Sequence, residues 1–296
     1  MDLSTHQPAG GTVYRISAPV IANRSLPGGH RRIRLRAPAI AKTARPGQFV
    51  NISPPLATTL LRRPLGVHRT IDGQDIEILF QSVGKGTKAL GAVDEGDEID
   101  LIGPLGNGFD LAGEPPETAV LVAGGFGLAP LYPLAAALEG KVARTYLFAG
   151  TEEDLPMETS DSSVHLSFVD PDIKATVPEF EAVGAQCRLA SLRGRPGFHK
   201  GLVTELVEKL LDGPERLGRT KLYACGPWGM LKKTAAIAAE HGLDCDVLLE
   251  ERMGCGVGAC MSCSVMVYGD DGQPVYARAC VEGPVFDAAS VVWDAK

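Results

Sequence analysis

The chain has 296 residues, of which 45% are hydrophobic and 22% are charged, and this ordinary balance excludes a largely disordered protein. Its formal net charge is −7, with 29 Lys and Arg residues against 36 Asp and Glu residues. An acidic chain of this kind lacks the basic surface by which proteins bind nucleic acid or anionic membranes, so we exclude both as partners.

The first third of the chain is predicted to be antiparallel β-structure. Five short segments alternate apolar and polar residues between turn-forming clusters such as LPGG and DEGD: GTVYRIS, HRRIRLRAP, GQFVNIS, DIEILFQSV and DEIDLIG. Strands of this length and spacing favour a small barrel or sandwich. A Pro-rich, acidic stretch over 111–118 marks a soft boundary, and we place the first domain at residues 1–115.

The middle of the chain alternates predicted strands with predicted helices. The predicted strands are AVLVAG, RTYLFAG, VHLSFVD, QCRLASL, KLYACG and CDVLLE. The predicted helices are LAPLYPLAAALEG, GLVTELVEKLLDG and GMLKKTAAIAAEHG. This rhythm predicts an α/β domain over 116–248, with a mostly parallel sheet and helices on both faces. The stretch from about 151 to 200 is assigned no role.

One uncharged run in the middle of the chain has the length of a membrane span. The twenty residues from Ala119 to Leu138 carry no charge. Three glycines and two prolines interrupt the run, which favours a buried strand, a turn and a core helix instead. The N-terminus, MDLSTHQPAGG, lacks the basic start and apolar core of a signal peptide. We therefore expect a cytoplasmic protein.

Four of the seven cysteines lie close together near the C-terminus, in the spacing C-x4-C-x2-C-x16-C. Three cysteines in this spacing followed by a distant fourth are the plant-type pattern for a [2Fe–2S] cluster. Glycines at 254, 256 and 258 allow the backbone to wrap closely and bring its N–H groups to the sulfurs. The candidate ligands, in a domain over 249–296, are Cys255, Cys260, Cys263 and Cys280.

A structural zinc site with four cysteine ligands is the alternative for this segment. Zinc ribbons usually present paired C-x2-C knuckles, whereas this segment has a single C-x2-C and a glycine-rich loop, which favours iron and sulfide. The absence of His from the segment disfavours a Rieske centre. Cys187 and Cys245 are predicted to be small buried hydrophobic residues. Cys225 is the exception, because it lies in a candidate nucleotide-binding loop, with simple burial as the alternative.

Four loops carry the residue types that hold phosphate groups. In the first domain, LLRRPLG places Arg63 beside a proline on a strand, and GKGT turns a strand into a helix, so a guanidinium and backbone N–H groups could meet a diphosphate. In the second domain, AGGFGLAPL and ACGPWGML each follow a strand, where parallel sheets bind their ligands. Neither loop matches G-x-G-x-x-G or a P-loop. A plain turn or a solvated edge is the alternative at these sites.

Together these segments resemble the ferredoxin-reductase-type flavoproteins, which pair an FAD-binding β-barrel with an NAD(P)-binding α/β domain. EERMGCGVGACMSC, with PGQFV, GKGT and GPLGNGF, is more specifically similar to the electron-transfer subunit of type 1B dihydroorotate dehydrogenases, over residues 12–290 or so. The resemblance implies a multidomain chain: an antiparallel β-barrel for FAD, a parallel α/β domain for NAD, and a small C-terminal [2Fe–2S] domain.

The resemblance also implies which residues contact the cofactors. The implied FAD contacts are Arg63, Pro64, Leu65, Gly66, Leu79, Phe80, Gln81, Gly86 and Thr87. The implied NAD contacts are Gly124, Gly125, Gly127, Ala129, Pro130, Cys225, Gly226 and Pro227. Two positions depart from the family pattern: Gly66 stands where many relatives have Ser or Thr, and Gln81 where relatives often have Arg or Lys. His68 and Arg69 lie nearby as candidates to compensate, with an exposed barrel edge as the alternative.

The implied function is that of an oxidoreductase subunit of pyrimidine biosynthesis. It would pass electrons between a partner dihydroorotate dehydrogenase subunit, which holds FMN, and NAD+, through [2Fe–2S] and FAD, in an assembly of two subunits of each kind. Because the substrate chemistry lies on the partner, we assign this chain no catalytic acid, base or nucleophile. NAD is preferred over NADP mainly on the family resemblance, since no Arg-rich patch follows the first glycine loop at a suitable spacing.

Two other functions remain open from the sequence. The small subunit of an NADH-dependent ferredoxin:NADP oxidoreductase or sulfide dehydrogenase shares the domain order and a similar cysteine tail. A zinc-stabilised nucleotide-binding regulator is the alternative that is not an enzyme. A visible spectrum together with the iron content separates this last alternative from the other two.

Overall fold

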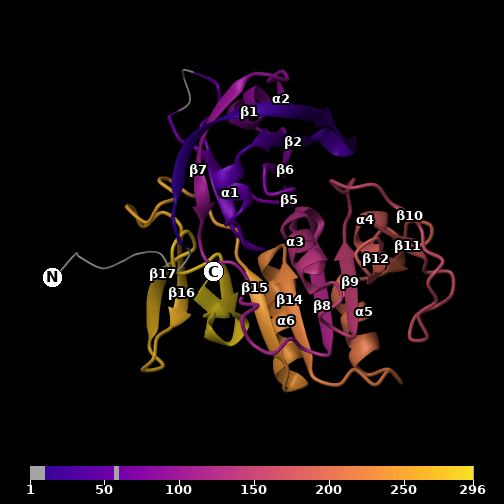
Figure 1. The fold of residues 1–296 in the computed structure, drawn as a ribbon. Helices are drawn as coiled ribbons and strands as arrows, with labels where there is room; N and C mark the ends of the chain where they lie inside the picture. Colours follow the sequence, from indigo (N-terminus) through magenta and orange to yellow (C-terminus); the bar gives the residue numbers. More distant parts are fainter. Residues whose placement is uncertain (1–10, 57–59, 296) are drawn as a thin grey trace. The chain divides into compact units, whose positions relative to one another are not determined.

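The computed structural model describes residues 11–56 and 60–295, and their contacts divide them into two compact units (Figure 1). Unit 1 comprises the described residues up to Phe109, together with Leu249–Phe286 and residues 290–295. Unit 2 comprises Asp110–Leu248 and Asp287–Ala289. The cysteine segment therefore shares a unit with the N-terminal sheet. The division into three domains stays a prediction.

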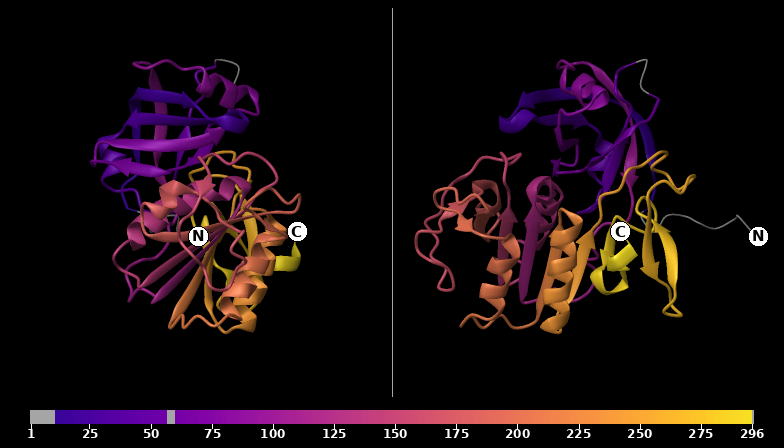
Figure 2. Two further views of the ribbon diagram at one scale, coloured as in Figure 1. Left: turned by 90° about the vertical axis from the view of Figure 1, so that its right-hand side faces the viewer. Right: turned by 180° about the vertical axis from the view of Figure 1, so that it is seen from behind.

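Unit 1 contains a seven-stranded antiparallel sheet in the order β4-β3-β7-β1-β2-β6-β5. In chain order its strands are β1 (Tyr14–Ser25), β2 (His30–Arg36), β3 (Phe49–Ile52), β4 (Arg63–Gly66), β5 (Arg69–Ile71), β6 (Asp75–Gln81) and β7 (Glu98–Leu105). β4, at one edge, also contacts β6, next to the other edge, so the sheet curls into a half-barrel, which Figure 2 shows from two sides. The predicted antiparallel barrel is confirmed.

The period-two pattern of the sequence places the core of this barrel. Ile33 and Leu35 of β2 and Ile76 and Ile78 of β6 are fully buried in one hydrophobic cluster, and the charged residues between them, Arg34 and Glu77, lie outside that cluster. The short helices are η1 (Pro27–Gly29), α1 (Pro38–Ala41) and α2 (Lys85–Gly91). Leu90 of α2 belongs to the same buried cluster, so the helix is fixed on the barrel by its apolar side.

Unit 2 is built on a sheet in the order β13-β12-β9-β8-β14-β15-β18. The strands within unit 2 are β8 (Thr118–Gly124), β9 (Arg144–Gly150), β12 (Ala185–Ser191), β13 (His199–Lys200), β14 (Thr220–Cys225) and β15 (Asp244–Leu248), whereas β18 (Val285–Asp287) has two of its three residues in unit 1. The pairs from β13 through to β15 are parallel. The helices are η2 (Gly125–Gly127), α3 (Leu128–Leu138), α4 (Pro178–Glu181), α5 (Val203–Leu211) and α6 (Trp228–Glu240). The predicted α/β architecture is confirmed.

The strand order reverses direction between β8 and β14. The chain moves outward from β8 through β9 to β12 and then returns to the other side of β8 with β14. Right-handed crossovers in opposite directions place their helices on opposite faces of the sheet, and α3 indeed contacts α4 whereas α5 contacts α6. The loops after β8 and β14 thus flank a topological switch point, where sheets of this class bind ligands.

One predicted strand is absent. VHLSFVD, at 164–170, forms no strand; the described structure has a loop there, between the two-residue strands β10 (Ser160–Asp161) and β11 (Ala175–Thr176). The alternating apolar residues of this segment pack on the sheet from a loop. Leu166 is buried, and the ring of Phe168 packs edge-on against Tyr146 and Phe148 of β9. The loop covers the sheet with alternate side chains and pairs with no strand, so the periodicity alone was misleading.

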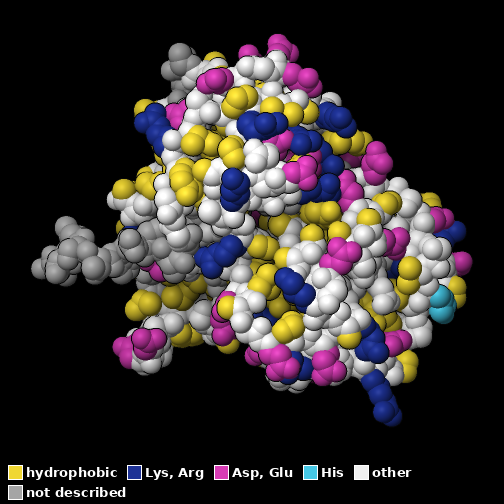
Figure 3. Space-filling model, in the orientation of Figure 1, with side chains coloured by type: hydrophobic (Ala, Val, Ile, Leu, Met, Phe, Trp, Pro, Cys, Tyr) yellow, Lys and Arg dark blue, Asp and Glu magenta, His cyan; other side chains and the backbone are white. Residues whose placement is uncertain are grey.

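The C-terminal segment forms a hairpin. β16 (Ser264–Tyr268) pairs antiparallel with β17 (Pro274–Arg278), and the turns η3 (Ala288–Ser290) and η4 (Trp293–Ala295) follow. The uncharged run 119–138 is β8, η2 and α3, as predicted. Within residues 11–56 and 60–295, no helix is long and apolar enough to span a membrane. On the face shown in Figure 3, acidic and basic side chains are interspersed.

Candidate iron–sulfur centre and nucleotide-binding loops

The hairpin of unit 1 brings two cysteine sulfurs together. Cys263 precedes β16 and Cys280 follows β17, and their Sγ atoms lie 3.4 Å apart. Both residues are buried, at 1% and 2% exposure, against Phe49 and Leu105 of the barrel. With metal–sulfur bonds of about 2.3 Å, two thiolates on one tetrahedral metal lie roughly 3.8 Å apart. The two sulfurs thus lie about 0.4 Å closer than two thiolates on one metal would, so a small movement would bring them to that separation.

The other two cysteines lie in a loop that directs hydrogen-bonding groups at their sulfurs. Cys255 Sγ accepts the backbone N–H groups of Val257 and Cys260, at 3.5 and 3.4 Å. Cys260 Sγ lies 3.2 Å from the hydroxyl oxygen of Ser262, and that oxygen accepts the N–H of Gly254 at 2.7 Å. The Ser262 side chain is the largest cause that lowers the pKa of Cys260, to about 6. Thiolates are the form that binds metals.

On the hairpin, burial changes a cysteine pKa in the opposite direction, because it disfavours the thiolate. It raises the pKa of Cys280 to about 12, with the neighbouring Cys263 adding to the effect. A coordinated thiol is deprotonated outright, so a metal bound here would have to displace that proton. The segment thus combines Cys260, whose pKa is lowered, with Cys280, whose pKa is raised. Metal binding would release the proton of the Cys280 thiol.

Two glycines allow the cysteine loop to pack closely. Gly256 has φ +69°, and a Cβ there would lie 2.5 Å from Asn51 Nδ2; Gly258 has φ +83°, and a Cβ there would lie 2.6 Å from Val281. In the parts of the chain that are described, no three His, Cys, Asp or Glu side chains are arranged to hold a metal ion. The structure brings the cysteines together as a neighbouring loop pair and a hairpin pair, and their joint ligation stays a prediction.

Two side chains that sequence reasoning missed fix this segment in place. Asn51 of β3 donates through Nδ2 to the carbonyl of Cys255 at 2.8 Å. Arg278 donates through Nη1 to the carbonyl of Gly258 at 2.8 Å and pairs with Glu282 at 2.6 Å. The position of Arg278, two residues before the fourth cysteine, could have suggested its role. No sequence signal connects Asn51 with a loop 204 positions away.

The structure brings together the residues predicted to hold a flavin diphosphate. A Cβ on Gly86 would lie 2.8 Å from Arg63 Nε, so the guanidinium lies directly against the GKGT turn. Arg63 Nη1 donates to the carbonyl of Leu61 at 2.6 Å, which orients the side chain. The hydroxyl oxygen of Thr87 accepts the N–H groups of Val83 and Gly84 at 3.1 Å each and so shapes the turn.

The other predicted flavin contacts differ in which of their groups could reach a bound flavin. Leu79 and Phe80 of β6 have buried side chains, at 2% and 1% exposure, so only their backbone groups could meet a ligand. Gln81 donates through Nε2 to the carbonyl of Gly28 at 3.2 Å and carries no charge for a phosphate. The remaining three lie on β4 and are half-buried: Pro64, Leu65 and Gly66.

In unit 2, the two predicted dinucleotide loops pack against each other. A Cβ on Gly127 would lie 2.1 Å from the carbonyl oxygen of Cys225, and a Cβ on Gly124 would lie 2.4 Å from Pro227. Gly226 has φ +154°, and its Cβ would lie 2.8 Å from the backbone of Gly124. Both loops therefore require glycine so that their backbones can approach at the switch point between β8 and β14. The Cys225 side chain is fully buried, so only its backbone groups could meet a dinucleotide.

The helix after the first loop carries the last two predicted contacts. Ala129 and Pro130 lie in the first turn of α3 and are buried, and Gly125, at φ +53°, turns the chain into that helix. Small residues here let the helix start close to the sheet, where its N-terminal N–H groups could meet a phosphate. The glycine loop and the helix start are thus positioned by the same strand, β8.

Comparisons with known proteins agree with this arrangement. A family model described as the iron–sulfur cluster binding domain of dihydroorotate dehydrogenase B matches residues 250–292. The dihydroorotate dehydrogenase B (NAD(+)) electron transfer subunit of Desulforamulus reducens is 35% identical over 251 residues, which cover 84% of this chain and 87% of that protein. Its counterpart from Geobacillus kaustophilus is 36% identical over 251 residues, with the same two coverages.

Solved structures show the same fold. A chain of an NADH-dependent reduced ferredoxin–NADP oxidoreductase matches with a TM-score of 0.75 and 30% identity, covering 96% of this chain and 92% of that chain. Phthalate dioxygenase reductase matches with a TM-score of 0.52 and 15% identity, covering 90% of this chain and 77% of its own. The second likeness, at this identity, concerns the fold alone.

Proposed function

The chain belongs to the family of dihydroorotate dehydrogenase B electron transfer subunits, and we propose that it carries electrons between a partner dihydroorotate dehydrogenase subunit and NAD+. The observation that carries the proposal is that residues 250–292 match an iron–sulfur domain within a chain similar to these subunits over 84% of its length. When bound, FAD exchanges two electrons with a nicotinamide and single electrons with a [2Fe–2S] cluster, so it would connect the two.

The chain's own residues hold and insulate these groups. Cys263 and Cys280 would supply two buried thiolates, and Cys255 and Cys260 two half-buried ones from the loop. Ser262 would direct its hydroxyl at the Cys260 sulfur, and hydrogen bonds to ligand sulfurs tune the potential of such centres. The packed glycine loops of unit 2 would receive the dinucleotide. No acid, base or nucleophile is needed for these transfers.

The partner and its surroundings follow from the family. We propose that the partner subunit holds FMN and oxidises dihydroorotate, that two subunits of each kind assemble, and that the complex works in the cytoplasm in pyrimidine biosynthesis. The nicotinamide cofactor is NAD(H), as in the names of the relatives.

The division of labour between the subunits is the test of this proposal. The purified chain with FAD and iron is expected to oxidise NADH with an artificial acceptor such as ferricyanide, but not to oxidise dihydroorotate. Addition of a catalytic subunit should couple dihydroorotate oxidation to NAD+ reduction, measured as NADH absorbance. Turnover of dihydroorotate by the single chain would overturn the subunit assignment, and inactivity toward NADH at full cofactor occupancy would overturn the reductase assignment.

A second function is favoured by one observation. The matched ferredoxin–NADP oxidoreductase chain is 30% identical over 96% of this chain, so a role as the small subunit of such an enzyme is the competing proposal. In that case a catalytic dihydroorotate dehydrogenase subunit would form no complex with the chain in size-exclusion chromatography. The match to an iron–sulfur family model favours iron over zinc in either role.

Replacing Arg63 with alanine is expected to weaken FAD binding by roughly 10- to 150-fold. The proposed guanidinium–diphosphate bond is charge-assisted, and such bonds contribute about 1.5–3 kcal/mol. A Gly86→Ala variant should weaken binding as well, because its Cβ would displace the guanidinium. The measurement is titration of the deflavinated protein with FAD, followed by fluorescence quenching.

Two controls separate this effect from a general loss of charge or shape. Arg24→Ala removes an exposed arginine of β1, and Gly113→Ala, outside the GKGT turn, adds a Cβ where no atom lies within 4 Å. Both variants should bind FAD within about twofold of the parent protein. Unchanged affinity in Arg63→Ala would show that another residue holds the diphosphate.

A further inference from the structure

Unit 2 contains a buried arginine without a counterion. Arg188 lies in the middle of β12, beside Phe148 of β9, and is 2% exposed. Its Nη1 donates to the carbonyl of Cys187 at 2.6 Å and its Nη2 to the carbonyl of Val164, while Nε has no hydrogen-bond partner. Among residues 11–56 and 60–295, no carboxylate forms an ion pair with it.

This guanidinium keeps its charge. Burial lowers the pKa of Arg188 from its ordinary value, but an arginine starts so far above neutrality that it remains protonated. Both of its hydrogen-bond acceptors are neutral carbonyls, which orient the group without neutralising it. A buried charge that is left unpaired costs several kcal/mol, so buried charges are normally paired. The nearby carboxylate of Glu181 accepts a hydrogen bond from Ser162 instead.

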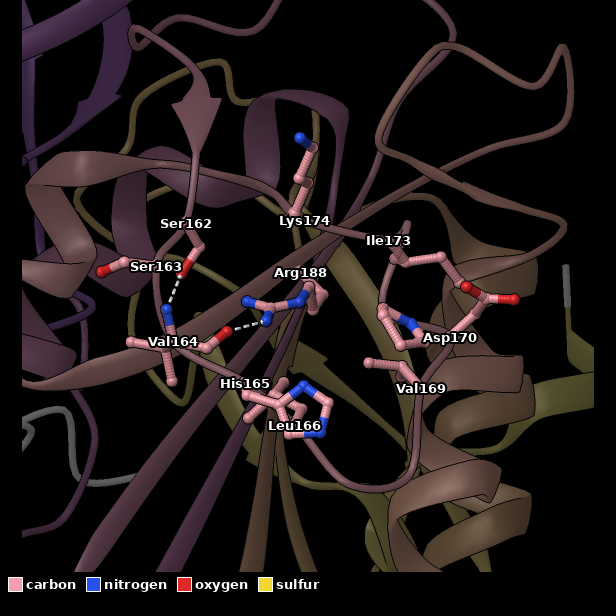
Figure 4. Close-up of a pocket in the computed structure, with 11 residues that line it drawn as sticks. Ser162, Ser163, Val164, His165, Leu166, Val169, Asp170, Ile173, Lys174 and Arg188 are labelled. Atoms are coloured by element: carbon pink, nitrogen blue, oxygen red, sulfur yellow. Dashed lines mark hydrogen bonds between the residues drawn. The ribbon is translucent and has the colours of Figure 1, made fainter.

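A cavity of about 160 Å³ lies next to this charge, under the loop that joins β10 to β11 (Figure 4). Besides Arg188 its lining residues include Ser162, Ser163, His165 and Lys174. Figure 4 shows the Arg188 guanidinium turned toward Ser162 and Val164. The volume lies below the roughly 300–1,000 Å³ of sites for drug-sized ligands, so the cavity suits a small group.

The lining carries charges of both signs, and they differ in how they are paired. Asp170 contributes one carboxylate, whose Oδ1 accepts the N–H of Asp172 at 2.9 Å. Lys174 pairs with Asp161 at 2.8 Å on the exposed side. Glu181, which is hydrogen-bonded to Ser162, acts on Arg188 only through space, so Arg188 is a cation of this lining that no carboxylate contacts directly. Guanidinium groups match the oxygens of phosphate and carboxylate in geometry.

We propose that Arg188 and the 162–174 loop form a binding site for a small oxyanion, a phosphate group, either as inorganic phosphate or as the head of a phosphomonoester. The loops after β8 and β14 belong to a different part of the sheet, because Arg188 lies at mid-strand on β12, two strands away from β8. The proposal rests on neither the partner nor the direction of electron transfer.

The test is calorimetric titration of the FAD- and iron-loaded chain with inorganic phosphate. NAD+ at saturation blocks the dinucleotide loops, and ionic strength is held constant with chloride. One saturable site is expected. Methyl phosphate in a parallel titration distinguishes the sources: tighter binding of the ester indicates a phosphomonoester, and binding of inorganic phosphate alone indicates the free ion.

A charge-matched pair of variants on the rim locates the site. Ser163 is exposed and lines the cavity. Ser163→Asp places a negative charge beside the anion and should weaken phosphate binding at least about tenfold. Ser163→Asn has nearly the same shape without the charge and should stay within about threefold. Lys141→Gln, at an exposed position outside the cavity, removes one positive charge and should leave the affinity unchanged.

Replacing Arg188 itself is expected to have the largest effect on phosphate binding. Arg188→Met keeps most of the side-chain volume and should abolish phosphate binding. If that variant does not fold, the Ser163 pair decides the matter alone. Absence of saturable binding up to about 10 mM phosphate, or equal binding by Ser163→Asp and Ser163→Asn, would overturn the proposal without touching the proposed function, whose test is NADH oxidation.

Discussion

A Cys263→Ser variant is expected to lose the iron–sulfur centre while it keeps FAD. Cys263 is buried against the barrel with its sulfur 3.4 Å from that of Cys280, and a serine hydroxyl at this position does not replace a thiolate ligand. Iron content should fall to near zero, and the paramagnetic signal of the NADH-reduced protein should vanish. Flavin absorbance should persist, because the flavin contacts proposed above belong to other segments.

A second cysteine serves as the matched control. Cys245 of β15 is also buried, and burial raises its pKa to about 12, but it lies outside the cysteine segment. Cys245→Ser should therefore cost stability, seen as a lower melting temperature, and leave iron content and spectrum unchanged. Full iron occupancy in Cys263→Ser, or in the corresponding Cys280→Ser variant, would contradict the assignment of the hairpin cysteines as ligands.

The parts of the fold that the sequence predicts correctly are those with local causes. Alternation in HRRIRLR and DIEILFQ produces β2 and β6 because every second side chain enters one core. The same local reasoning failed for 164–170, where the apolar residues cover a sheet face from a loop. The periodicity of apolar residues indicates which side chains are buried. It does not indicate whether the backbone of that segment forms hydrogen bonds to another strand.

The candidate site shows the same limit. Spacing and glycines point to the cysteines and to the two glycine loops, because these features are confined to short segments. Asn51 donates a hydrogen bond to the carbonyl of Cys255, which lies 204 positions away in the sequence. Arg188 donates one to the carbonyl of Val164, which lies 24 positions away. Contacts of this kind depend on which segments the fold places side by side. The segment 151–200, to which the sequence assigns no role, therefore became interpretable only with Arg188 and its cavity in view.

Replacing Gly127 with alanine is expected to reduce kcat/KM for NADH by about 100-fold. The backbone of Gly127 is already in an ordinary helical conformation, so space alone forbids a side chain: its Cβ would lie 2.1 Å from the carbonyl oxygen of Cys225. That oxygen is backbone and cannot rotate away, so one of the two loops must move. A displacement of roughly 1 Å in a positioning loop can cost two orders of magnitude in rate.

The measurement isolates the dinucleotide step. In Gly127→Ala, dithionite should still reduce both the flavin and the iron–sulfur centre, whereas NADH should reduce them slowly and only at high concentration. Gly113→Ala is the matched control, since it lies outside both glycine loops with no atom within 4 Å of the added Cβ. It should keep the parent KM and melt no earlier. Equal kinetics of the two variants with NADH would show that the packed glycine loops do not form the dinucleotide site, whatever the fate of the cluster and the flavin.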